Sequence, residues 1–268
     1  MEIVLLDKTN QETVIANAVE VLKRGGIVIY PTETCYGAAV DATNQEAVDR
    51  LKEYKQFRGQ KPISIAVHSK EMAQEYAQIN EIADNVYENY LPGPITVVSK
   101  SRGKVAKGVE SDWGTVGVRI PDHNIPIAIV KAFGKPITAT SANVSYKSLP
   151  YSIEGLLKNT PQKSQEFLDL LIDAGELEKN VPSTVLDTTL NSLQVLRQGK
   201  IEFEDAIKKS KLLKEVVTKT PDETVGFARE IAEHFIEQHR NGSLVLALSG
   251  ELGAGKTQFS KDVGEFLK

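Results

Sequence analysis

The sequence predicts an α/β fold, because segments with helical periodicity alternate with short apolar runs along most of its 268 residues. Two neighbouring segments carry this prediction. Residues 10–24 place apolar side chains at the spacing of one helix face, and they stop at Gly25 and Gly26. The next residues, Ile27–Tyr30, form a continuous apolar run that indicates a buried strand, which Pro31 ends.

The same alternation continues along the chain. We expect a helix over about Gln45–Tyr54 and another after Ser69, whose hydroxyl can cap it. We expect further strands at Ile63–Val67, Thr96–Ser99, Gly117–Ile120, Ile137–Thr140, Ser183–Asp187 and Gln194–Leu196. Because helices separate some of these strands but not others, the sheet is expected to be mixed rather than a simple barrel.

Composition divides the chain into three parts. Residues 1–205 hold the alternating pattern and are expected to form one domain. Residues 206–219 are rich in Lys and Glu with few strong breakers, which predicts a helical linker. A second unit is expected over residues 220–268, where Thr220 and Glu223 form a capping signature before a helical apolar pattern.

Composition and charge also narrow the class of protein. A hydrophobic content of 41% and a charged content of 25% are typical of a soluble globular chain. The net charge of −4 gives no sign of bulk affinity for nucleic acid or for an anionic membrane. The single cysteine, Cys35, excludes an intramolecular disulfide and fits a reducing compartment. Without a signal peptide or an apolar run near the ~20 residues of a membrane span, we expect a cytoplasmic protein with no membrane partner.

The sharpest single motif lies near the C-terminal end. The segment GELGAGKT at 250–257 fits the GxxxxGK[ST] pattern of a phosphate-binding loop, and it stands between an apolar run and a helical stretch. In such a loop Gly250 and Gly255 let the backbone wrap phosphates, Lys256 neutralises them, and the Thr257 hydroxyl ligates Mg²⁺. A P-loop ATPase needs further strands and a carboxylate for Mg²⁺. Because 11 residues follow Thr257 (268 − 257), we expect an incomplete domain that does not hydrolyse ATP competently.

Six short motifs resemble, in order, those of YrdC-type threonylcarbamoyl-AMP synthases. They are PTETCYG at 31–37, LPGPIT at 91–96, VRIP at 118–121, TSAN at 140–143, PSTV at 182–185 and LRQG at 196–199. Each motif alone is a weak signal, whereas the ordered set is hard to explain by chance. The resemblance implies a twisted mixed sheet with flanking helices and a basic cleft. It also implies an enzyme that makes threonylcarbamoyl-AMP and pyrophosphate from ATP, L-threonine and bicarbonate, for tRNA modification.

The chemistry of this reaction requires cationic side chains, because a triphosphate must be bound without a phosphate-loop helix. Lys55, Arg58 and Lys61 lie within seven residues. Taken alone they favour a solvated basic turn by about two to one. The resemblance reverses this preference and implies that all three bind ATP, with Lys55 and Arg58 as catalytic residues. The family pattern is K-x-R, whereas this chain has K-x-x-R, so Phe57 stands where an Arg is expected and we expect Arg58 to reach the site through a bulge.

Further polar residues complete the expected site. Ser141 and Asn143 alternate at a strand end and so face one side, and Arg119 on an apolar strand needs an anionic partner. The resemblance implies that Ser141, Asn143 and Arg197 bind the nucleotide, and that threonine is bound by Thr32, Thr34, His68, Arg119, Thr140 and Ser183. Without the resemblance, locally satisfied turns and a structural histidine stay open as readings.

Three expectations concern the neighbouring groups. Glu33 is expected to orient a cation or a donor rather than to act as a general base. Cys35 is expected to pack in the core, because free Cys is usually buried. Mg²⁺ is expected to arrive with ATP, and no metal site made of protein ligands is expected.

The C-terminal segment has a resemblance of its own. TPDET at 220–224 and LSGELGAGKT at 248–257 look like the opening of a TsaE-type ATPase. That family supports the complex that transfers the threonylcarbamoyl group to tRNA, so the resemblance implies this complex and tRNA as partners. Two other functions stay open. One is an RNA-binding module that uses the basic cleft, which a steep salt dependence would reveal. The other is a P-loop ATPase with a regulatory N-terminal region.

Overall fold

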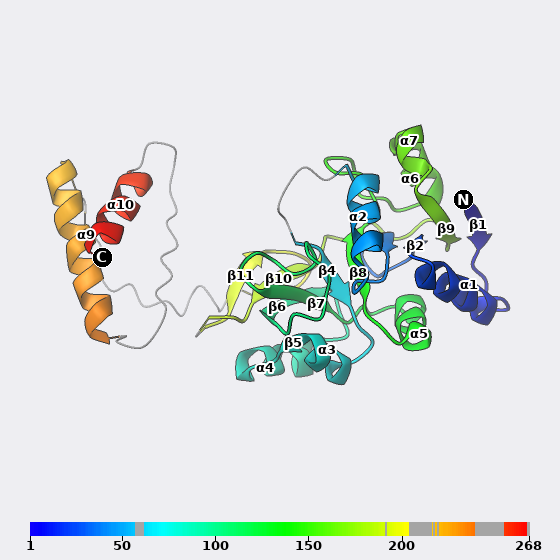
Figure 1. The fold of residues 1–268 in the computed structure, drawn as a ribbon, viewed down its shortest axis with the longest axis horizontal. Helices are drawn as coiled ribbons and strands as arrows, with labels where there is room; N and C mark the ends of the chain where they lie inside the picture. Colours follow the sequence, from blue (N-terminus) through cyan, green and yellow to red (C-terminus); the bar gives the residue numbers. More distant parts are fainter. Residues whose placement is uncertain are drawn as a thin grey trace. The chain divides into compact units, whose positions relative to one another are not determined.

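The chain separates into two compact units, residues 1–209 and 210–268 (Figure 1). A computed structural model describes residues 1–56, 62–190, 192–203, 216, 218, 220–238 and 255–266. Most of the linker helix predicted over 206–219, and the apolar run before the GELGAGKT segment, lie outside the described residues.

The first unit is a mixed α/β fold, as the alternating pattern predicts. Its described elements are, in chain order, β1 (Glu2–Leu5), α1 (Gln11–Lys23), β2 (Ile27–Tyr30), β3 (Gly37–Ala39), α2 (Gln45–Tyr54), β4 (Ser64–Ala66), α3 (Lys70–Tyr76), β5 (Ala77–Gln78), α4 (Glu81–Tyr90), β6 (Ile95–Ser101), β7 (Thr115–Arg119), α5 (Asn124–Phe133), β8 (Ile137–Ser141), α6 (Ile153–Asn159), α7 (Gln162–Gln165), β9 (Leu168–Asp173), β10 (Thr184–Asp187) and β11 (Gln194–Arg197).

These strands join in a single sheet. Its order is β1-β9-β2-β3-β8-β4-β7-β6-β10-β11, and β5 pairs with β6. Four pairs are parallel, namely β1/β9, β2/β9, β4/β7 and β6/β10, and the other pairs are antiparallel. The prediction of a mixed sheet is therefore confirmed.

Local sequence signals explain where several elements begin. Ser69 accepts a hydrogen bond from the Met72 N–H and caps α3, as predicted. Asn10 precedes α1, but its side chain does not cap the helix. Instead the Asn10 amide donates to the Leu5 carbonyl and accepts from the Asp7 N–H, because the chain turns sharply between β1 and α1.

Helices cover both sides of the sheet. Figure 1 shows α3, α4 and α5 on one side and α2, α6 and α7 on the other. The core between these layers is apolar and includes fully buried Leu22, Ile65 and Val118. No helix in the described part of the chain is long and apolar enough to cross a membrane.

The register across the middle of the sheet brings polar residues from different strands to one face. Side chains that pair directly across strands point to the same face. The pairs on this face are Tyr30–Gly37, Gly37–Ser141, Ser64–Ala139, Ala66–Arg119, Val98–Gly117 and Thr96–Val185. Alternate residues along each strand share that face. Ser141 and Arg119 are therefore brought to one face, although they end two different strands. The register between β10 and β11 shifts at Val185, and Arg197 is instead placed by its hydrogen bonds to Ser183.

The second unit contains α9 (Pro221–Gln238) and α10 (Lys256–Phe266). Thr220 accepts a hydrogen bond from the Glu223 N–H at 3.3 Å, which confirms the predicted cap of α9. Ala228 and Ala232 of α9 are buried with Val263 of α10. The two helices therefore pack along a narrow apolar seam.

A matched pair of leucine substitutions tests the core. Leu22 is fully buried in α1, whereas Leu5 is 67% exposed at the end of β1. We expect Leu22→Ala to lower the free energy of unfolding by about 2–5 kcal/mol, because it removes packed methyl groups and leaves a cavity. Leu5→Ala should change it by less than about 0.5 kcal/mol. Chemical denaturation followed by far-ultraviolet circular dichroism measures both, and equal losses would contradict this assignment of the core.

Candidate active site

The ammonium group of Lys55 lies at the centre of the predicted site. Lys55 directly follows the last residue of α2 as its C-cap, and only 6% of the residue is exposed. Its Nζ donates to the Ser141 carbonyl at 2.5 Å and to the Asn143 carbonyl at 2.9 Å. Burial lowers the pKa of Lys55 to about 8, because desolvation penalises the charged form and no carboxylate pairs with it among the described residues. Lys55 is therefore not the solvated basic group that local sequence alone favours.

The TSAN segment, residues 140–143, contains the residues that surround the Lys55 ammonium group. Ser141 is the last residue of β8, and its hydroxyl donates to Asn143 Oδ1 at 2.5 Å. The Asn143 amide in turn donates to the Lys147 carbonyl at 2.6 Å. The two side chains therefore lie together, in agreement with their alternation in the sequence.

The backbone is strained where these two segments meet. Gln56, directly after Lys55, has a φ of 49°, and Tyr146 has a φ of 67°. Residues other than Gly rarely adopt this left-handed backbone conformation. Between these residues, the Ser145 N–H donates to the Lys55 carbonyl at 3.0 Å. Strain of this kind persists where the surrounding structure holds it, often at functional sites.

A second charged pair joins the loop after β2 to the end of β7. Arg119 Nη2 lies 2.5 Å from Glu33 Oε1, and the two side chains are 13% and 12% exposed. Asn180 holds the same loop by donating from its amide to the Glu33 carbonyl at 3.1 Å. The anionic partner expected for Arg119 is therefore present within the chain, and Glu33 orients a cation, as expected.

The PSTV and LRQG motifs meet through Arg197. Its guanidinium donates to the Ser183 carbonyl at 2.7 Å and to the Ser183 hydroxyl at 3.1 Å. The Ser183 hydroxyl also lies 3.3 Å from Thr96 Oγ1, so the LPGPIT motif joins the same group. Burial, followed by the positive charge of Arg119, lowers the pKa of Arg197. Arg119 and Arg197 are therefore close enough to repel each other.

The PTETCYG motif forms a tight turn beside these cations. Thr32 Oγ1 donates to the Cys35 carbonyl at 2.6 Å, and it lies 3.0 Å from Thr34 Oγ1. Cys35 is buried, as expected, and burial raises the pKa of its thiol above the usual value. The positive charges of Arg119 and Lys55 partly oppose this rise, which places both cations within electrostatic range of the turn.

The remaining predicted residues are Thr140, His68, Arg58 and Lys61, and the structure contradicts the expected side-chain role of Thr140 alone among those it describes. Thr140 pairs with Ala38, so its side chain points away from the face that carries Ser141. His68 lies two residues after the end of β4. The residue before it, Val67, donates from its N–H to the Arg119 carbonyl at 2.9 Å, so His68 lies near the end of β7. Arg58 and Lys61 lie outside the described residues, as does the expected bulge.

Sequence reasoning missed two neighbours of Glu33. His123 precedes α5 and accepts the Ile125 N–H through Nδ1. Burial lowers the pKa of His123, and the charge of Glu33 partly opposes this. Asn180, the second neighbour, binds the Lys200 ammonium through Oδ1 at 3.1 Å. Both residues reach the site through long-range packing, and no local motif marks them.

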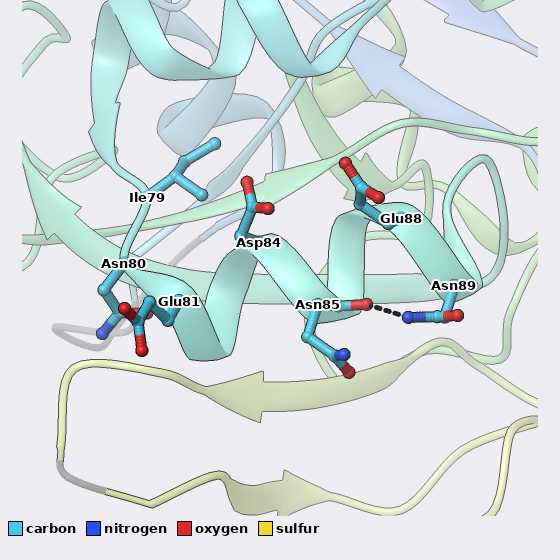
Figure 2. Close-up of a pocket in the computed structure, with 7 residues that line it drawn as sticks. All are labelled: Ile79, Asn80, Glu81, Asp84, Asn85, Glu88 and Asn89. Carbon is cyan, nitrogen blue, oxygen red and sulfur yellow. Dashed lines mark hydrogen bonds between the residues drawn. The ribbon is translucent and has the colours of Figure 1, made fainter.

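A separate acidic groove runs along α4 (Figure 2). Glu81, Asp84 and Glu88 are among its lining residues, and Lys70 pairs with the last two at 2.5 and 2.8 Å. Its negative charge does not suit a triphosphate. Among the described residues, no group of three or more His, Cys, Asp or Glu side chains could hold a metal ion.

The GELGAGKT segment is described in part. Gly250 lies outside the described residues. Gly255 has a φ of 78°, and α10 begins at the next residue, Lys256, with Thr257 exposed in its first turn. The Phe259 N–H donates to the Gly255 carbonyl at 3.0 Å. The glycine therefore precedes the helix in a left-handed conformation that favours Gly.

Comparison with known proteins identifies curated relatives of the first unit. A putative threonylcarbamoyl-AMP synthase of Methanocaldococcus jannaschii is 31% identical over 201 residues, which cover 74% of this chain and 92% of that protein. A threonylcarbamoyl-AMP synthase of Pyrococcus abyssi is 32% identical over 196 residues, covering 73% of this chain and 56% of that protein. The uncharacterized Escherichia coli protein YciO is 26% identical over 190 residues, covering 70% of this chain and 90% of that protein.

Solved structures share the fold. The crystal structure of Pyrococcus abyssi Sua5 with L-threonine matches with a TM-score of 0.68 at 23% identity, covering 100% of this chain and 90% of that one. The crystal structure of Escherichia coli YciO matches with a TM-score of 0.64 at 25% identity, covering 74% of this chain and 94% of that one. The profile of the Sua5/YciO/YrdC family, described as "Telomere recombination", matches residues 20–199. Because this match spans more than half of the 268 residues, the chain belongs to the Sua5/YciO/YrdC family.

Proposed function

We propose that residues 1–205 form an L-threonylcarbamoyladenylate synthase, which makes threonylcarbamoyl-AMP and pyrophosphate from L-threonine, bicarbonate and ATP. The relatives named threonylcarbamoyl-AMP synthase and the Sua5 structure with L-threonine support this activity. Within the chain, the observation that carries it is the buried Lys55 ammonium beside Ser141 and Asn143, on a sheet face shared with Arg119. A cationic face of this kind suits a nucleotide triphosphate and an amino-acid carboxylate.

The reaction has two bond-forming steps. The threonine nitrogen attacks the bicarbonate carbon, and loss of water leaves a carbamate. A carbamate oxygen then attacks the α-phosphorus of ATP, and the bond to the bridging oxygen breaks as pyrophosphate leaves with the electron pair. The chain offers charge and positioning rather than a covalent nucleophile, since the Cys35 thiol is buried with a raised pKa.

In the proposed complex the residues divide between the two substrates. Lys55, with Arg58 and Lys61, neutralises charge that develops on the pyrophosphate, which Mg²⁺ accompanies as part of the ATP substrate. Ser141, Asn143 and Arg197 hold the nucleotide. Threonine is bound by Thr32, Thr34, His68, Arg119 and Ser183, where Arg119 takes the carboxylate. Thr140 has no side-chain role in this complex, because its side chain points to the other face of the sheet. Ser183 already contacts Arg197, so the two substrate groups adjoin.

We further propose that residues 220–268 are the opening of a TsaE-type P-loop ATPase domain. The left-handed Gly255 before α10 supports this, because a left-handed residue next to right-handed ones turns successive N–H groups toward one point, where an anion can bind. A fused domain of this kind would associate the synthase with the complex that transfers the threonylcarbamoyl group to tRNA.

Omission of each substrate tests the synthase assignment. Pyrophosphate release from ATP should require both threonine and bicarbonate, and the nucleotide product should be threonylcarbamoyl-AMP. Lys55→Ala should lower this rate by about 100-fold or more, because it removes the buried cation at the triphosphate. The exposed Lys23→Ala is the matched control and should keep the wild-type rate. Release that is indifferent to threonine, or a fully active Lys55→Ala protein, would refute the assignment.

The lowered pKa of Lys55 predicts how ATP affinity depends on pH. In the ligand-free protein Lys55 is cationic below a pH of about 8 and neutral above it. The dissociation constant for ATP should therefore rise above that pH, by at most about tenfold per pH unit. Lys55→Arg keeps its charge over this range, so its affinity should fall much less. Equilibrium binding of a fluorescent ATP analogue measures both curves, and parallel curves would contradict the role of Lys55.

The two units should be separable in activity. Lys256→Ala removes the lysine of the proposed phosphate loop, in the unit that lies beyond residue 209. Because the synthase residues all lie in the first unit, pyrophosphate release that depends on threonine should stay within about twofold of wild type. A large loss in the Lys256→Ala protein would mean that the second unit takes part in the synthase reaction.

A further inference from the structure

The ion pair between Glu33 and Arg119 leaves one polar atom of each side chain without a hydrogen bond. Carboxylate and guanidinium groups commonly form two parallel hydrogen bonds. Here Arg119 Nη2 contacts Glu33 Oε1, while Glu33 Oε2 and Arg119 Nε are buried without a hydrogen-bond partner. In the described part of the chain four buried side-chain polar atoms lack a partner, and two of them belong to this single pair. Buried polar groups are normally satisfied, so the pair offers one free acceptor beside one free donor.

The buried carboxylate of Asp41 uses both of its oxygens. Asp41 accepts from the Thr43 N–H and hydroxyl through Oδ1, and from the Lys135 ammonium through Oδ2. The buried, unpaired oxygen of Glu33 therefore differs from the buried carboxylate of Asp41, which leaves no oxygen unpaired.

Among the residues that the structure describes, no second cation contacts that oxygen. His123 lies within electrostatic range, but burial lowers its pKa and its Nδ1 already accepts the Ile125 N–H. The Cys35 thiol and the Tyr30 phenol also sense the charge of Glu33, and burial raises the pKa of both. A free carboxylate oxygen among neutral groups is suited to a ligand that brings its own donor.

We infer that Glu33 binds the amino nitrogen of the amino-acid substrate through Oε2, while Arg119 Nε donates to the substrate carboxylate. An α-amino acid carries a donor and an acceptor on adjacent carbon atoms, which complements the free acceptor and donor of this pair. Glu33 is thus a specificity-determining residue that selects α-amino acids over other carboxylic acids. The inference rests on the proposed function for the identity of the amino acid, L-threonine.

Binding to the wild-type protein gives the first test and needs no substitution. The probes are L-threonine and the hydroxy acid that differs from it only by lacking the α-amino group. Isothermal titration of the full chain should show the hydroxy acid binding at least about tenfold more weakly, because it leaves Glu33 Oε2 unpaired. Equal affinities would overturn the inference.

Glu33→Gln gives the second test. It is isosteric and can still accept a hydrogen bond from Arg119, but it loses the negative charge that a protonated amino group requires. Its affinity for L-threonine should fall about tenfold, while its affinity for the hydroxy acid changes by less than about twofold. An equal loss for both ligands would mean that Glu33 only holds Arg119 in place, and would overturn the inference.

A matched control separates this effect from general damage to buried ion pairs. Asp41→Asn alters a carboxylate of similar burial, paired with Lys135. It should lower thermal stability but leave the ratio of the two affinities unchanged. A change in that ratio as large as that of Glu33→Gln would overturn the specific role of Glu33.

The same proteins distinguish this inference from the proposed function. Suppose the wild type releases pyrophosphate only with threonine, but Glu33→Gln keeps the wild-type ratio of affinities. This result would support the synthase activity and refute the role of Glu33. If threonine binds with a selectivity that depends on Glu33 but supports no pyrophosphate release, the amino-acid site stands and the synthase reaction fails.

Discussion

The fold depends on the pairing of β3 between β2 and β8, which joins the two halves of the sheet. β3 contains only Gly37, Ala38 and Ala39, so it adds little bulk to either face. The Tyr30 ring packs over Gly37, where a Cβ would lie 2.8 Å from the Tyr30 ring. Gly117 is equally constrained, since its Cβ would lie 2.7 Å from Ser64 Oγ. Small residues in the middle of the sheet therefore let the Tyr30 ring and the Ser64 side chain pack closely across the strands.

Charge on that face is balanced within the chain in two different ways. Lys55 donates to two main-chain carbonyls and has no counterion among the described residues, and burial lowers its pKa. Arg119 instead has Glu33 as its counterion, and the pair keeps one free donor and one free acceptor. The unpaired charge of Lys55 favours a polyanion, whereas the Glu33–Arg119 pair favours a ligand that carries both a positive and a negative group. This difference explains how one sheet face could bind a nucleotide and an amino acid side by side.

The positions of β1, β3 and β9 were not predicted from the sequence, and the reasons differ. β3 is a run of Gly and Ala, residues with low strand propensity, and becomes a strand because both neighbours pair with it. β1 is short and largely exposed, and it is held by parallel pairing with β9, more than 160 residues away in the chain. In contrast, β2 and α2 have the predicted bounds, because continuous burial and helical periodicity are local signals.

The sequence by itself determined the α/β class and the family, because ordered motifs and hydrophobic periodicity can be read locally. It also indicated that Ser141 and Asn143 lie together and that Arg119 needs an anion. The tertiary structure decided that this anion is Glu33, that Lys55 is buried against carbonyls, and that Thr140 points to the other face. It also brought His123 and Asn180 to Glu33. These outcomes depend on strand register and long-range packing, which fix side-chain direction only once the whole sheet has formed.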